Sequence, residues 1–166
     1  MASRHVLANL VVAQDGSTSA GGSSIGLTTQ RDRARFHQLR STADLIIVGG
    51  ATARLEPYEK TPVTLLVITR SELSGRAASN PLARAFNGTI SEAVANATGR
   101  ILLECGRTLL LQAIQHNLVD ELHLTQVAGT PGENIIDLEI LLANFEEHSR
   151  EVYLQETFLR FKRKSA

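Results

Sequence analysis

The strongest constraint on the fold is the alternation of short apolar runs with helical segments along residues 6–127. Residues 6–13, 45–48 and 63–69 are nearly continuous runs of aliphatic residues, and each run stops at Gly or at a polar loop. Runs this short and this rich in Val, Ile and Leu are typical of strands that are buried on both faces of a sheet. The segments between them have helical spacing, so the sequence predicts a mostly parallel sheet with helices on both faces.

The expected helices have recognisable ends. Thr28 or Thr29 can cap a helix near residues 29–42, whose apolar positions are Ala34, Phe36, Leu39 and Ala43. Further elements continue the alternation: helical turns at 51–55, helices at 91–97 and 107–116, and strands at 100–103 and 118–127. Two late runs, 151–154 and 158–161, are typical of an antiparallel hairpin. The pattern of residues 84–90 is ambiguous and predicts no particular element. Residues 16–26 and 70–80 are rich in Gly and Ser, which predicts loops.

Length and charge limit the class of protein. The 166 residues, 43% hydrophobic and 20% charged, are expected to form one domain, residues 1–166. Seventeen basic and seventeen acidic residues cancel, so nucleic-acid binding is not expected. The basic residues at 160–164 predict a solvated tail or an edge strand. No apolar run approaches the roughly twenty residues that span a bilayer, and the single cysteine, Cys105, excludes an internal disulfide and favours the cytoplasm.

Three strand ends carry residues that suit a phosphorylated ligand. Ligands of open α/β sheets collect at the carboxyl ends of parallel strands, where helix N-termini present unpaired N–H groups to anions. Glycines and hydroxyls follow the strand at 45–48, a Thr-Arg-Ser sequence ends the strand at 63–69, and a small-residue turn follows the strand at 100–103. Arg70 in particular can bind a phosphate through two N–H groups. Together these three ends favour a phosphorylated ligand more than any one of them does alone.

Each of these signals also has a plain structural interpretation. Gly49-Gly50 can be a simple tight turn, Glu104 can accept hydrogen bonds from its own turn, and Arg70 can be a solvated loop residue. Cys105 has no identifiable partner that would make it a nucleophile. The five histidines lack metal-binding spacing, and no G-x-S-x-G elbow lies between a strand and a helix.

Several segments resemble, in order, the pyrimidine reductase family of riboflavin biosynthesis, which has the dihydrofolate-reductase-like fold. The matching segments are the opening N-x-x-x-S-x-D-G at 9–16, the S-x-W-I-[ST] and L-R segments at 24–28 and 39–40, the G-x-x-T turn at 49–52, the E-G-G turn at 104–106 and the L-V-D-E-L strand entry at 118–122. Their order and spacing over residues 6–128 are more specific than any single motif.

The resemblance implies a three-layer α/β/α dihydrofolate-reductase-like fold, with a mixed, mostly parallel central sheet and an antiparallel C-terminal hairpin, in a homodimer. It also implies that NADPH transfers a hydride to the ribosylamino carbon of a phosphoribosylaminouracil. The cofactor would contact the three strand ends, at Gly49, Gly50, Ala51, Thr52, Thr69, Arg70, Ser71, Glu104, Cys105, Gly106, Arg107 and Thr108. The substrate would contact Asn9, Asp15, Ser24, Arg40 and Glu56, with Glu56 as the catalytic candidate.

Two other functions are compatible with the sequence. The first is reduction of a dihydrofolate or another pteridine, with the same cofactor. The second belongs to a different class, a non-catalytic nucleotide-binding protein on the same fold, since several motif positions are changed, such as Cys105 in place of Gly. Binding of NADPH and turnover of each substrate would separate the three.

Overall fold

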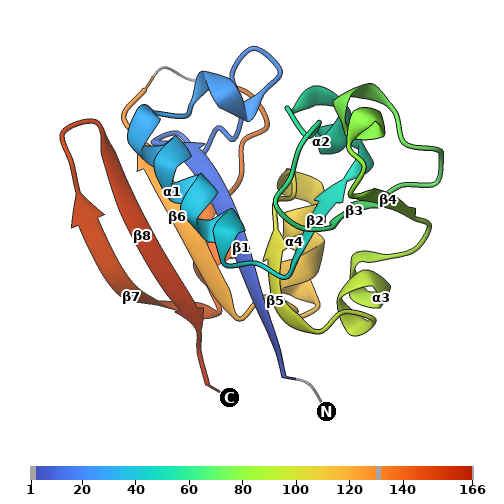
Figure 1. Cartoon of the computed structure of the whole chain (residues 1–166). Coiled ribbons are helices and arrows are strands. Elements are labelled where there is room, and N and C mark those ends of the chain that lie inside the picture. Colours follow the sequence, from blue (N-terminus) through green and yellow to red (C-terminus); the bar gives the residue numbers. More distant parts are fainter. Residues whose placement is uncertain (1–2, 130–131, 166) are drawn as a thin grey trace.

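A single mixed sheet runs through the molecule (Figure 1). The computed structural model describes residues 3–129 and 132–165, and within them eight strands are ordered β4-β3-β2-β5-β1-β6-β8-β7. The strands β4, β3, β2, β5, β1 and β6 pair in parallel, and β8 pairs antiparallel with both β6 and β7. Their bounds are β1 Arg4–Ala13, β2 Leu45–Gly49, β3 Leu65–Ile68, β4 Ala83–Phe86, β5 Gly99–Leu103, β6 Glu121–Val127, β7 Phe145–Val152 and β8 Glu156–Arg163. The predicted parallel sheet and antiparallel hairpin are therefore confirmed.

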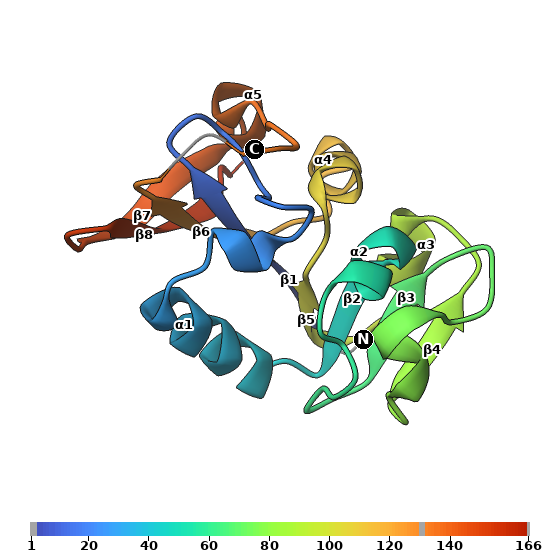
Figure 2. The ribbon, with the colours of Figure 1, turned by 90° about the horizontal axis from the view of Figure 1, so that it is seen from above.

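Helices cover both faces of the sheet (Figures 1 and 2). One apolar cluster joins the sheet to α3, α4 and α5, and a second joins the other face to α1, α2 and η2. The helical bounds are η1 Ser24–Gly26, α1 Gln30–Ser41, α2 Gly50–Leu55, η2 Gly75–Ser79, α3 Ile90–Ala95, α4 Arg107–Gln115 and α5 Leu138–Leu142. The three-layer arrangement follows because each strand side chain points to the face opposite its neighbour's.

The central strand β1 shows why its sequence is almost continuously apolar. Val6 and Ala8 pack in the cluster with α4, whereas Leu7 packs in the cluster with α1. A strand that is covered on both faces needs apolar residues at odd and even positions alike. The exception in its middle is Asn9, which is partly exposed on the α1 face.

The inner face of α1 differs from the predicted apolar face. Ala34 is exposed, while the buried positions include Asp32 and Arg40 beside Leu39. Thr29 caps the helix by accepting a hydrogen bond from the Asp32 backbone N–H at 3.0 Å, as one of the two predicted caps. The predicted apolar face is therefore wrong at Ala34, because α1 is rotated so that polar side chains face the sheet in its place.

The C-terminal basic segment is neither a tail nor an edge strand, so that prediction was wrong. Strand β8 lies between β6 and β7, and the edge position belongs to β7. Arg160 donates to Glu121 through two nitrogens, at 2.6 and 2.9 Å, and Arg163 donates to Asp120 at 2.6 Å. These two arginines pair with the carboxylates of Glu121, the first residue of β6, and of Asp120 just before it.

Two further elements were not predicted as such. Residues 83–86 form the edge strand β4, and a one-turn helix, α5, begins after Asp137, whose side chain accepts from the backbone N–H groups of Glu139 and Ile140. The first hairpin strand begins and ends earlier than predicted, at 145–152 rather than 151–154, and the second extends the predicted 158–161 at both ends. No helix in residues 3–129 and 132–165 has the length and apolar character needed to span a bilayer.

Candidate functional site

The three predicted strand ends lie next to one another at one edge of the sheet. Strands β3, β2 and β5 are neighbours in the sheet and run in the same direction, so the turns that follow them meet at their carboxyl ends. Figure 2 views the molecule from this side and shows α2 and α4 starting there. The segments that the sequence singled out are therefore neighbours in space.

The glycines of these turns are needed for space rather than for unusual backbone angles. The φ angles of Gly49 and Gly106 are −81° and −63°, which any residue adopts. A Cβ atom at Gly50 would lie 3.2 Å from the Thr69 hydroxyl oxygen, and one at Gly106 would lie 3.1 Å from the Thr52 hydroxyl oxygen. The three turns are thus in direct contact, with two threonine hydroxyls between them.

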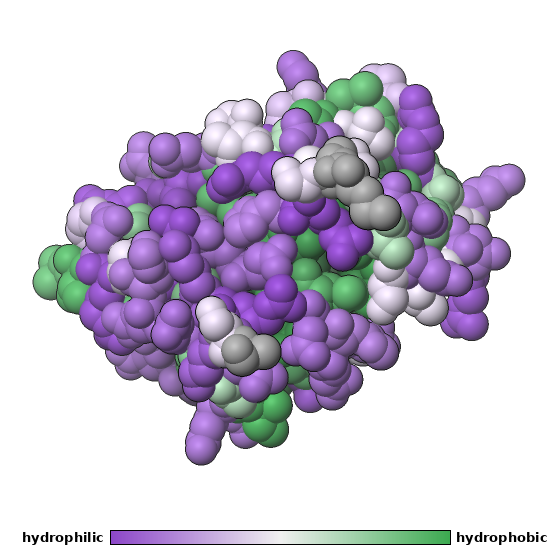
Figure 3. Space-filling model, turned by 90° about the horizontal axis from the view of Figure 1, so that it is seen from below, coloured by the Kyte–Doolittle hydropathy of each residue, from purple (hydrophilic) through white to green (hydrophobic). Residues whose placement is uncertain are grey.

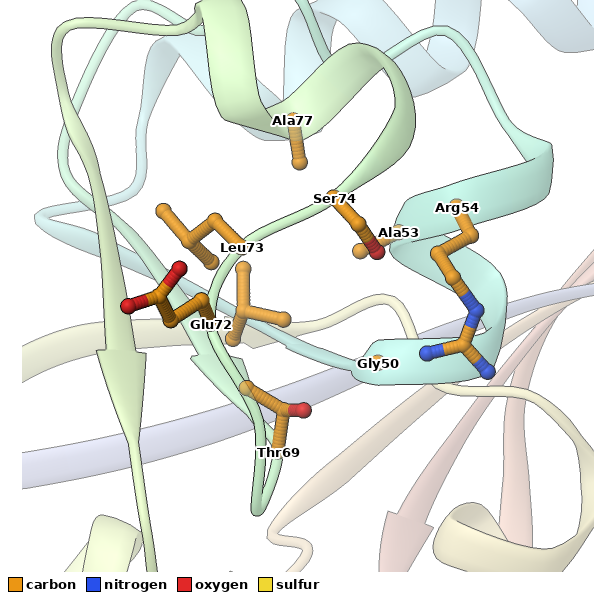
Figure 4. Close-up of a pocket in the computed structure, with 9 residues that line it drawn as sticks. Gly50, Ala53, Arg54, Thr69, Glu72, Leu73, Ser74 and Ala77 are labelled. Atoms are coloured by element: carbon orange, nitrogen blue, oxygen red, sulfur yellow. The ribbon is translucent and has the colours of Figure 1, made fainter.

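A small hollow opens beside the β2 and β3 ends (Figure 4). Gly50, Arg54, Thr69 and Ser74 are among the residues that line it. The Thr69 hydroxyl lies 3.2 Å from the Ser71 hydroxyl. Thr69 and the Arg54 guanidinium both lie next to Gly50, at the start of α2. Arg54 was missed from the sequence because it sits one turn into α2, away from the strand end. The predicted Arg70 is exposed next to this group.

The N-terminus of α4 offers unpaired backbone donors. Its first residue is Arg107 and its N-cap is Gly106, which has no side chain to satisfy the first N–H groups. Such donors carry the positive end of the helix dipole and favour a bound anion. Thr108 lies in the same first turn, so the predicted positions 106–108 lie at the positive end of the helix.

Arg40 and Glu104 form a buried ion pair. The Arg40 Nε and Nη2 atoms donate to the two Glu104 oxygens at 2.8 and 2.7 Å, and the Tyr58 hydroxyl donates to Glu104 Oε2 at 2.6 Å. Burial disfavours the charged guanidinium, but the hydrogen bonds to Glu104 outweigh this and raise the Arg40 pKa. Burial also raises the pKa of Tyr58 well above its usual value.

This pair connects parts of the predicted site that the sequence assigned separately. Arg40 was expected to contact the substrate and Glu104 the cofactor, yet they contact each other rather than the open part of the site. Arg40 also stacks between aromatic rings, with its Cζ atom 4.2 Å from the Phe36 centroid and 5.0 Å from that of Tyr58. The pair fixes α1 against the β5–α4 turn.

Glu56 lies in contact with the loop before α1. Glu56 Oε1 accepts from the Ser23 hydroxyl at 3.0 Å and from the Ser24 backbone N–H at 2.8 Å. The contact to Ser24 therefore uses its backbone, which leaves its hydroxyl available. Arg40 lies outside this group because it is held by Glu104.

Asn9 lies within β1, whereas Asp15 lies in the turn that follows this strand, and their surroundings differ. Asp15 follows β1 and accepts from the Ser17 backbone N–H at 3.0 Å, and hydrogen bonds from Ser17 lower its pKa. Its side chain holds the turn. Asn9 is partly exposed in the middle of the sheet and forms no side-chain hydrogen bond with any residue that the structure describes.

Polar side chains of α1 and β6 face each other between the helix and the sheet, and they were not identified from the sequence. Asp32 and Arg35 project from α1 toward β6, where Thr125 and His123 lie. Because Asn9 is in register with His123 and Val11 with Thr125, these two β6 side chains share the α1 face with Asn9. Burial raises the pKa of Asp32, although a hydrogen bond to Thr125 opposes that shift. The helical period alone could have placed Asp32 and Arg35 on one face with Leu39.

A chain of hydrogen bonds continues from Arg35 toward β8. Arg35 Nη2 lies 3.2 Å from His123 Nδ1, and His123 Nε2 lies 2.6 Å from Glu121 Oε1. Burial lowers the His123 pKa, so the ring is favoured in its neutral form, accepting from Arg35 and donating to Glu121. Burial works against the charge of Glu121, but hydrogen bonds from Arg160 and His123 prevail and lower its pKa to about 2.

Cys105 is buried, and burial raises its pKa strongly, so its thiol stays protonated and unreactive. The described residues contain no group of three His, Cys, Asp or Glu side chains that could hold a metal ion.

The opposite end of the sheet carries a second depression. Figure 3 shows this lower face, which is mostly hydrophilic with apolar residues near its middle. A groove of about 600 Å³ here is lined by residues that include Arg4, Asp120 and Arg163. Arg4 already donates to the Val94 carbonyl at 3.1 Å and Arg163 to Asp120, so the groove offers no free cation at these positions.

Comparison with known proteins links this architecture to a family. The family model of the RibD C-terminal domain matches residues 4–157. None of the curated proteins matches the chain.

Solved structures with similar folds include three reductases or reductase-like proteins. A pyrimidine reductase-like protein from Corynebacterium diphtheriae has a TM-score of 0.74 and 18% identity, with 98% of this chain and 92% of that chain covered. The dihydrofolate reductase of Enterococcus faecalis, complexed with NADP(H) and RAB-propyl, has a TM-score of 0.70 and 17% identity, with 97% of both chains covered. A diaminohydroxyphosphoribosylaminopyrimidine deaminase/5-amino-6-(5-phosphoribosylamino)uracil reductase from Thermotoga maritima has a TM-score of 0.74 and 14% identity, with 98% of this chain but 57% of that chain covered.

Proposed function

Because the chain belongs to the RibD C-terminal domain family, as its motifs predicted, we propose that it is an NADPH-dependent reductase of a phosphoribosylaminopyrimidine. The observation that carries this proposal is the meeting of three strand ends with the uncapped N-terminus of α4. NADPH would supply the hydride, which is delivered to the ribosylamino carbon, while the protein contributes orientation and charge.

The cofactor side of the proposal uses residues that lie in contact. The N–H groups at 106–108 suit the pyrophosphate, because they are unpaired and lie at the positive end of a helix. Thr69, Ser71 and the two guanidinium groups of Arg54 and Arg70 suit the extra phosphate that distinguishes NADPH from NADH. The residues present therefore fit the cofactor.

The substrate side lies under α1 and next to the loop before it. Asn9 offers a free amide on the sheet, and Glu56 holds the Ser23–Ser24 backbone at the edge of the same region. We assign Glu56 to positioning this loop, and the Ser24 hydroxyl to the substrate. Arg40 would act through Glu104, by fixing α1 relative to the cofactor turn.

Calorimetric titration with NADPH and NADH tests the cofactor assignment. The wild-type protein should bind NADPH more tightly than NADH, and Arg70→Ala should weaken NADPH by about tenfold or more while changing NADH little. Arg84→Ala, which removes an exposed arginine from β4, serves as the control. Equal affinity of the wild type for both dinucleotides would contradict the role of Arg70.

Product analysis tests the substrate assignment. The phosphoribosylaminouracil and dihydrofolate are incubated separately with the protein and NADPH, and the reduced products are identified. We expect turnover of the pyrimidine. Reduction of dihydrofolate alone would favour the pteridine reductase, a candidate supported by Asp32, because a raised pKa keeps a proton on its carboxyl to higher pH. NADPH binding without either product would instead favour a non-catalytic nucleotide-binding protein.

We also propose that the protein acts as a homodimer in the cytoplasm. The single buried cysteine suits a reducing compartment. Sedimentation of the purified chain over a range of concentrations tests the dimer, and a monomer at micromolar concentrations would contradict it.

A further inference from the structure

Asn87 is the one asparagine in the sequence that is followed by glycine. The pair Asn87-Gly88 lies between the end of β4 at Phe86 and the N-cap of α3 at Thr89. The Asn87 side chain is exposed and forms no hydrogen bond with any residue that the structure describes. Its amide carbon is therefore open to attack, because no partner holds the side chain away from the backbone.

The nucleophile that an asparagine amide can reach within its own chain is the backbone nitrogen of the next residue. The Gly88 N–H donates to no acceptor within residues 3–129 and 132–165. Glycine also has no Cβ atom that would crowd the reaction, and its backbone reaches angles that other residues avoid. The amide of Asn87 and the nitrogen of Gly88 are thus both free to react with each other.

Two other asparagines lack this combination. Asn96 is exposed like Asn87, but the nitrogen that follows it, on Ala97, donates to the Val94 carbonyl at 3.2 Å. Asn80 is buried, and the proline that follows it has no N–H. Exposure of the side chain is therefore not what distinguishes Asn87, since Asn96 shares it. The difference lies in the backbone nitrogen that comes next.

The single Asp-Gly pair of the chain, Asp15-Gly16, could close the same kind of ring but is held by hydrogen bonds. The Gly16 N–H donates to the Ala13 carbonyl at 3.0 Å, and the Asp15 carboxylate accepts from the Ser17 backbone N–H at 3.0 Å. Both reacting groups are engaged in the turn after β1. The fold thus protects Asp15 and leaves Asn87 unprotected.

We propose that Asn87 is a site of spontaneous deamidation through the Gly88 nitrogen. This nitrogen loses its proton to solvent and bonds to the Asn87 Cγ atom, and the side-chain nitrogen takes up a proton and leaves as ammonia, which closes a succinimide ring. Water then opens the ring. Cleavage of the new bond from Cγ to nitrogen gives aspartate, and cleavage of the original peptide bond gives isoaspartate. The net reaction consumes one water, releases one ammonia and needs no oxidant or reductant.

The new carboxylate would lie beside one of the strand ends assigned to the cofactor. The Thr69 N–H donates to the Phe86 carbonyl at 3.0 Å, so residue 87 directly follows the contact between β4 and the end of β3. Thr69, Arg70 and Ser71 are the residues proposed to receive the extra phosphate of NADPH. A negative charge at residue 87 would repel that phosphate. This consequence rests on the proposed function, whereas the deamidation itself does not.

Mass spectrometry of the folded protein tests the modification. The native chain is incubated in mildly alkaline buffer made with heavy-oxygen water and is then digested with trypsin in ordinary water. The tryptic peptide of residues 85–100 contains both Asn87 and Asn96, so fragment ions compare the two within one peptide. We expect label and conversion at Asn87, with Asn96 unchanged. Asn87→Gln should stop the conversion, because its longer side chain closes the ring much more slowly.

Two results would overturn the proposal. In the first, Asn87 stays unmodified in the native protein over a time in which it converts in the urea-unfolded chain, which would mean that the fold protects it. In the second, Asn96 converts as fast as Asn87 in the native protein, which would mean that the free Gly88 nitrogen gives no selectivity.

Asn87→Asp tests the consequence for the cofactor, because it carries the product carboxylate on an unaltered backbone. Calorimetry should show NADPH weakened by about threefold or more and NADH changed by less than about twofold. Asn96→Asp, which adds the same charge at the C-cap of α3, is the matched control and should bind both dinucleotides like the wild type.

The two measurements fail separately. Wild-type affinity of Asn87→Asp for NADPH would reject the effect on the cofactor, while conversion at Asn87 would still establish the modification. If the wild-type protein binds neither dinucleotide, the proposed function is rejected, and mass spectrometry still decides whether Asn87 deamidates.

Discussion

Two arginines on the inner side of α1 show how surroundings decide what a residue can do. Arg40 is enclosed by Glu104, Tyr58 and Phe36, so its guanidinium holds the fold together. Arg35, by contrast, contacts only neutral partners, which are the Thr125 hydroxyl, the His123 ring and the Leu159 carbonyl oxygen. The sequence motif pointed to Arg40, because a motif records the residue type and its spacing but not the partner that the fold places beside it.

The Arg40–Glu104 pair should contribute strongly to stability. Arg40→Ala leaves the Glu104 carboxylate buried without its cation, and we expect the free energy of unfolding to fall by about 3–5 kcal/mol. Urea denaturation followed by circular dichroism measures this change. Arg33→Ala, on the exposed side of the same helix, should change stability by no more than about 0.5 kcal/mol. Similar losses in both variants would show that the pair has no special role.

Acid should weaken the protein through Glu121. Its pKa is lowered from 4.5 to about 2 in the folded protein, so the folded state favours the ionised form. This contribution is fully present above pH 4.5 and is lost as the pH falls toward about 2. Glu121→Gln should therefore be less stable than the wild type at pH 7, with a smaller difference at pH 3. Urea midpoints at the two pH values check this, and a constant difference would contradict it.

At the scale of single elements, local sequence signals determine where helices start. Thr89 accepts from the Glu92 backbone N–H at 3.2 Å, and Glu92 accepts from the Thr89 backbone N–H at 2.7 Å, which forms a capping box at the start of α3. This pattern explains why a helix was predictable there to within a residue or two. Asp137 gives a similar signal before α5, but the apolar run that follows it is too short to distinguish a helix from a loop.

The capping box gives a prediction of moderate size. Thr89→Ala removes the acceptor for the Glu92 N–H and should lower the free energy of unfolding by about 1 kcal/mol. Thr98→Ala, at a threonine outside any cap, is the matched control. Thermal unfolding of both variants at equal concentration makes the comparison. If Thr98→Ala is as destabilised as Thr89→Ala, the cap does not account for the loss.

Other elements could not be predicted because packing, not propensity, decides them. Strand β4 is four residues long, pairs on one side only and exposes Arg84 and Ala85, so it has no alternating pattern. The place of β8 inside the sheet depends on β7, which precedes β8 in sequence but lies outside it in the sheet. The register between two strands that are distant in sequence cannot be predicted from the sequence of either strand alone.

At the scale of the whole molecule, the two apolar clusters share the strands between them. Ile47 and Leu103 belong to the cluster with α4, while their sequence neighbours Ile46 and Leu102 belong to the cluster with α1. Loss of either layer of helices would expose one face of the same strands. The layers should therefore unfold together, as in other single domains of this size.

This cooperativity can be measured with the two tyrosines, since the chain contains no tryptophan. Tyr153→Phe keeps the ring on which Arg31 stacks and leaves Tyr58, buried in the cluster with α1, as the only tyrosine. Its fluorescence and the far-ultraviolet circular dichroism should give the same urea midpoint. Two separate midpoints would show that the cluster with α1 unfolds independently of the rest.

The sequence predicted the position of the candidate site better than the contacts inside it. Strand ends and glycine turns are local features, so residues 49–52, 69–71 and 104–108 can be identified from the sequence alone, and they do lie together. The polar surface formed by Asp32, Arg35 and His123 depends on how α1 is rotated over β6, which is a tertiary property. The roles assigned to individual residues of the site stay predictions until the ligands are tested.

The burial of Cys105 has a practical consequence for measuring how α1 moves. A thiol that is both enclosed and held protonated will react slowly with maleimide or spin-label reagents. A cysteine introduced at an exposed position, such as Gln38 on the outer side of α1, would then be the one readily labelled thiol in the chain. The native protein is in this respect already a suitable background for site-specific labelling, and a probe on α1 could report ligand entry without removal of any natural residue from the core.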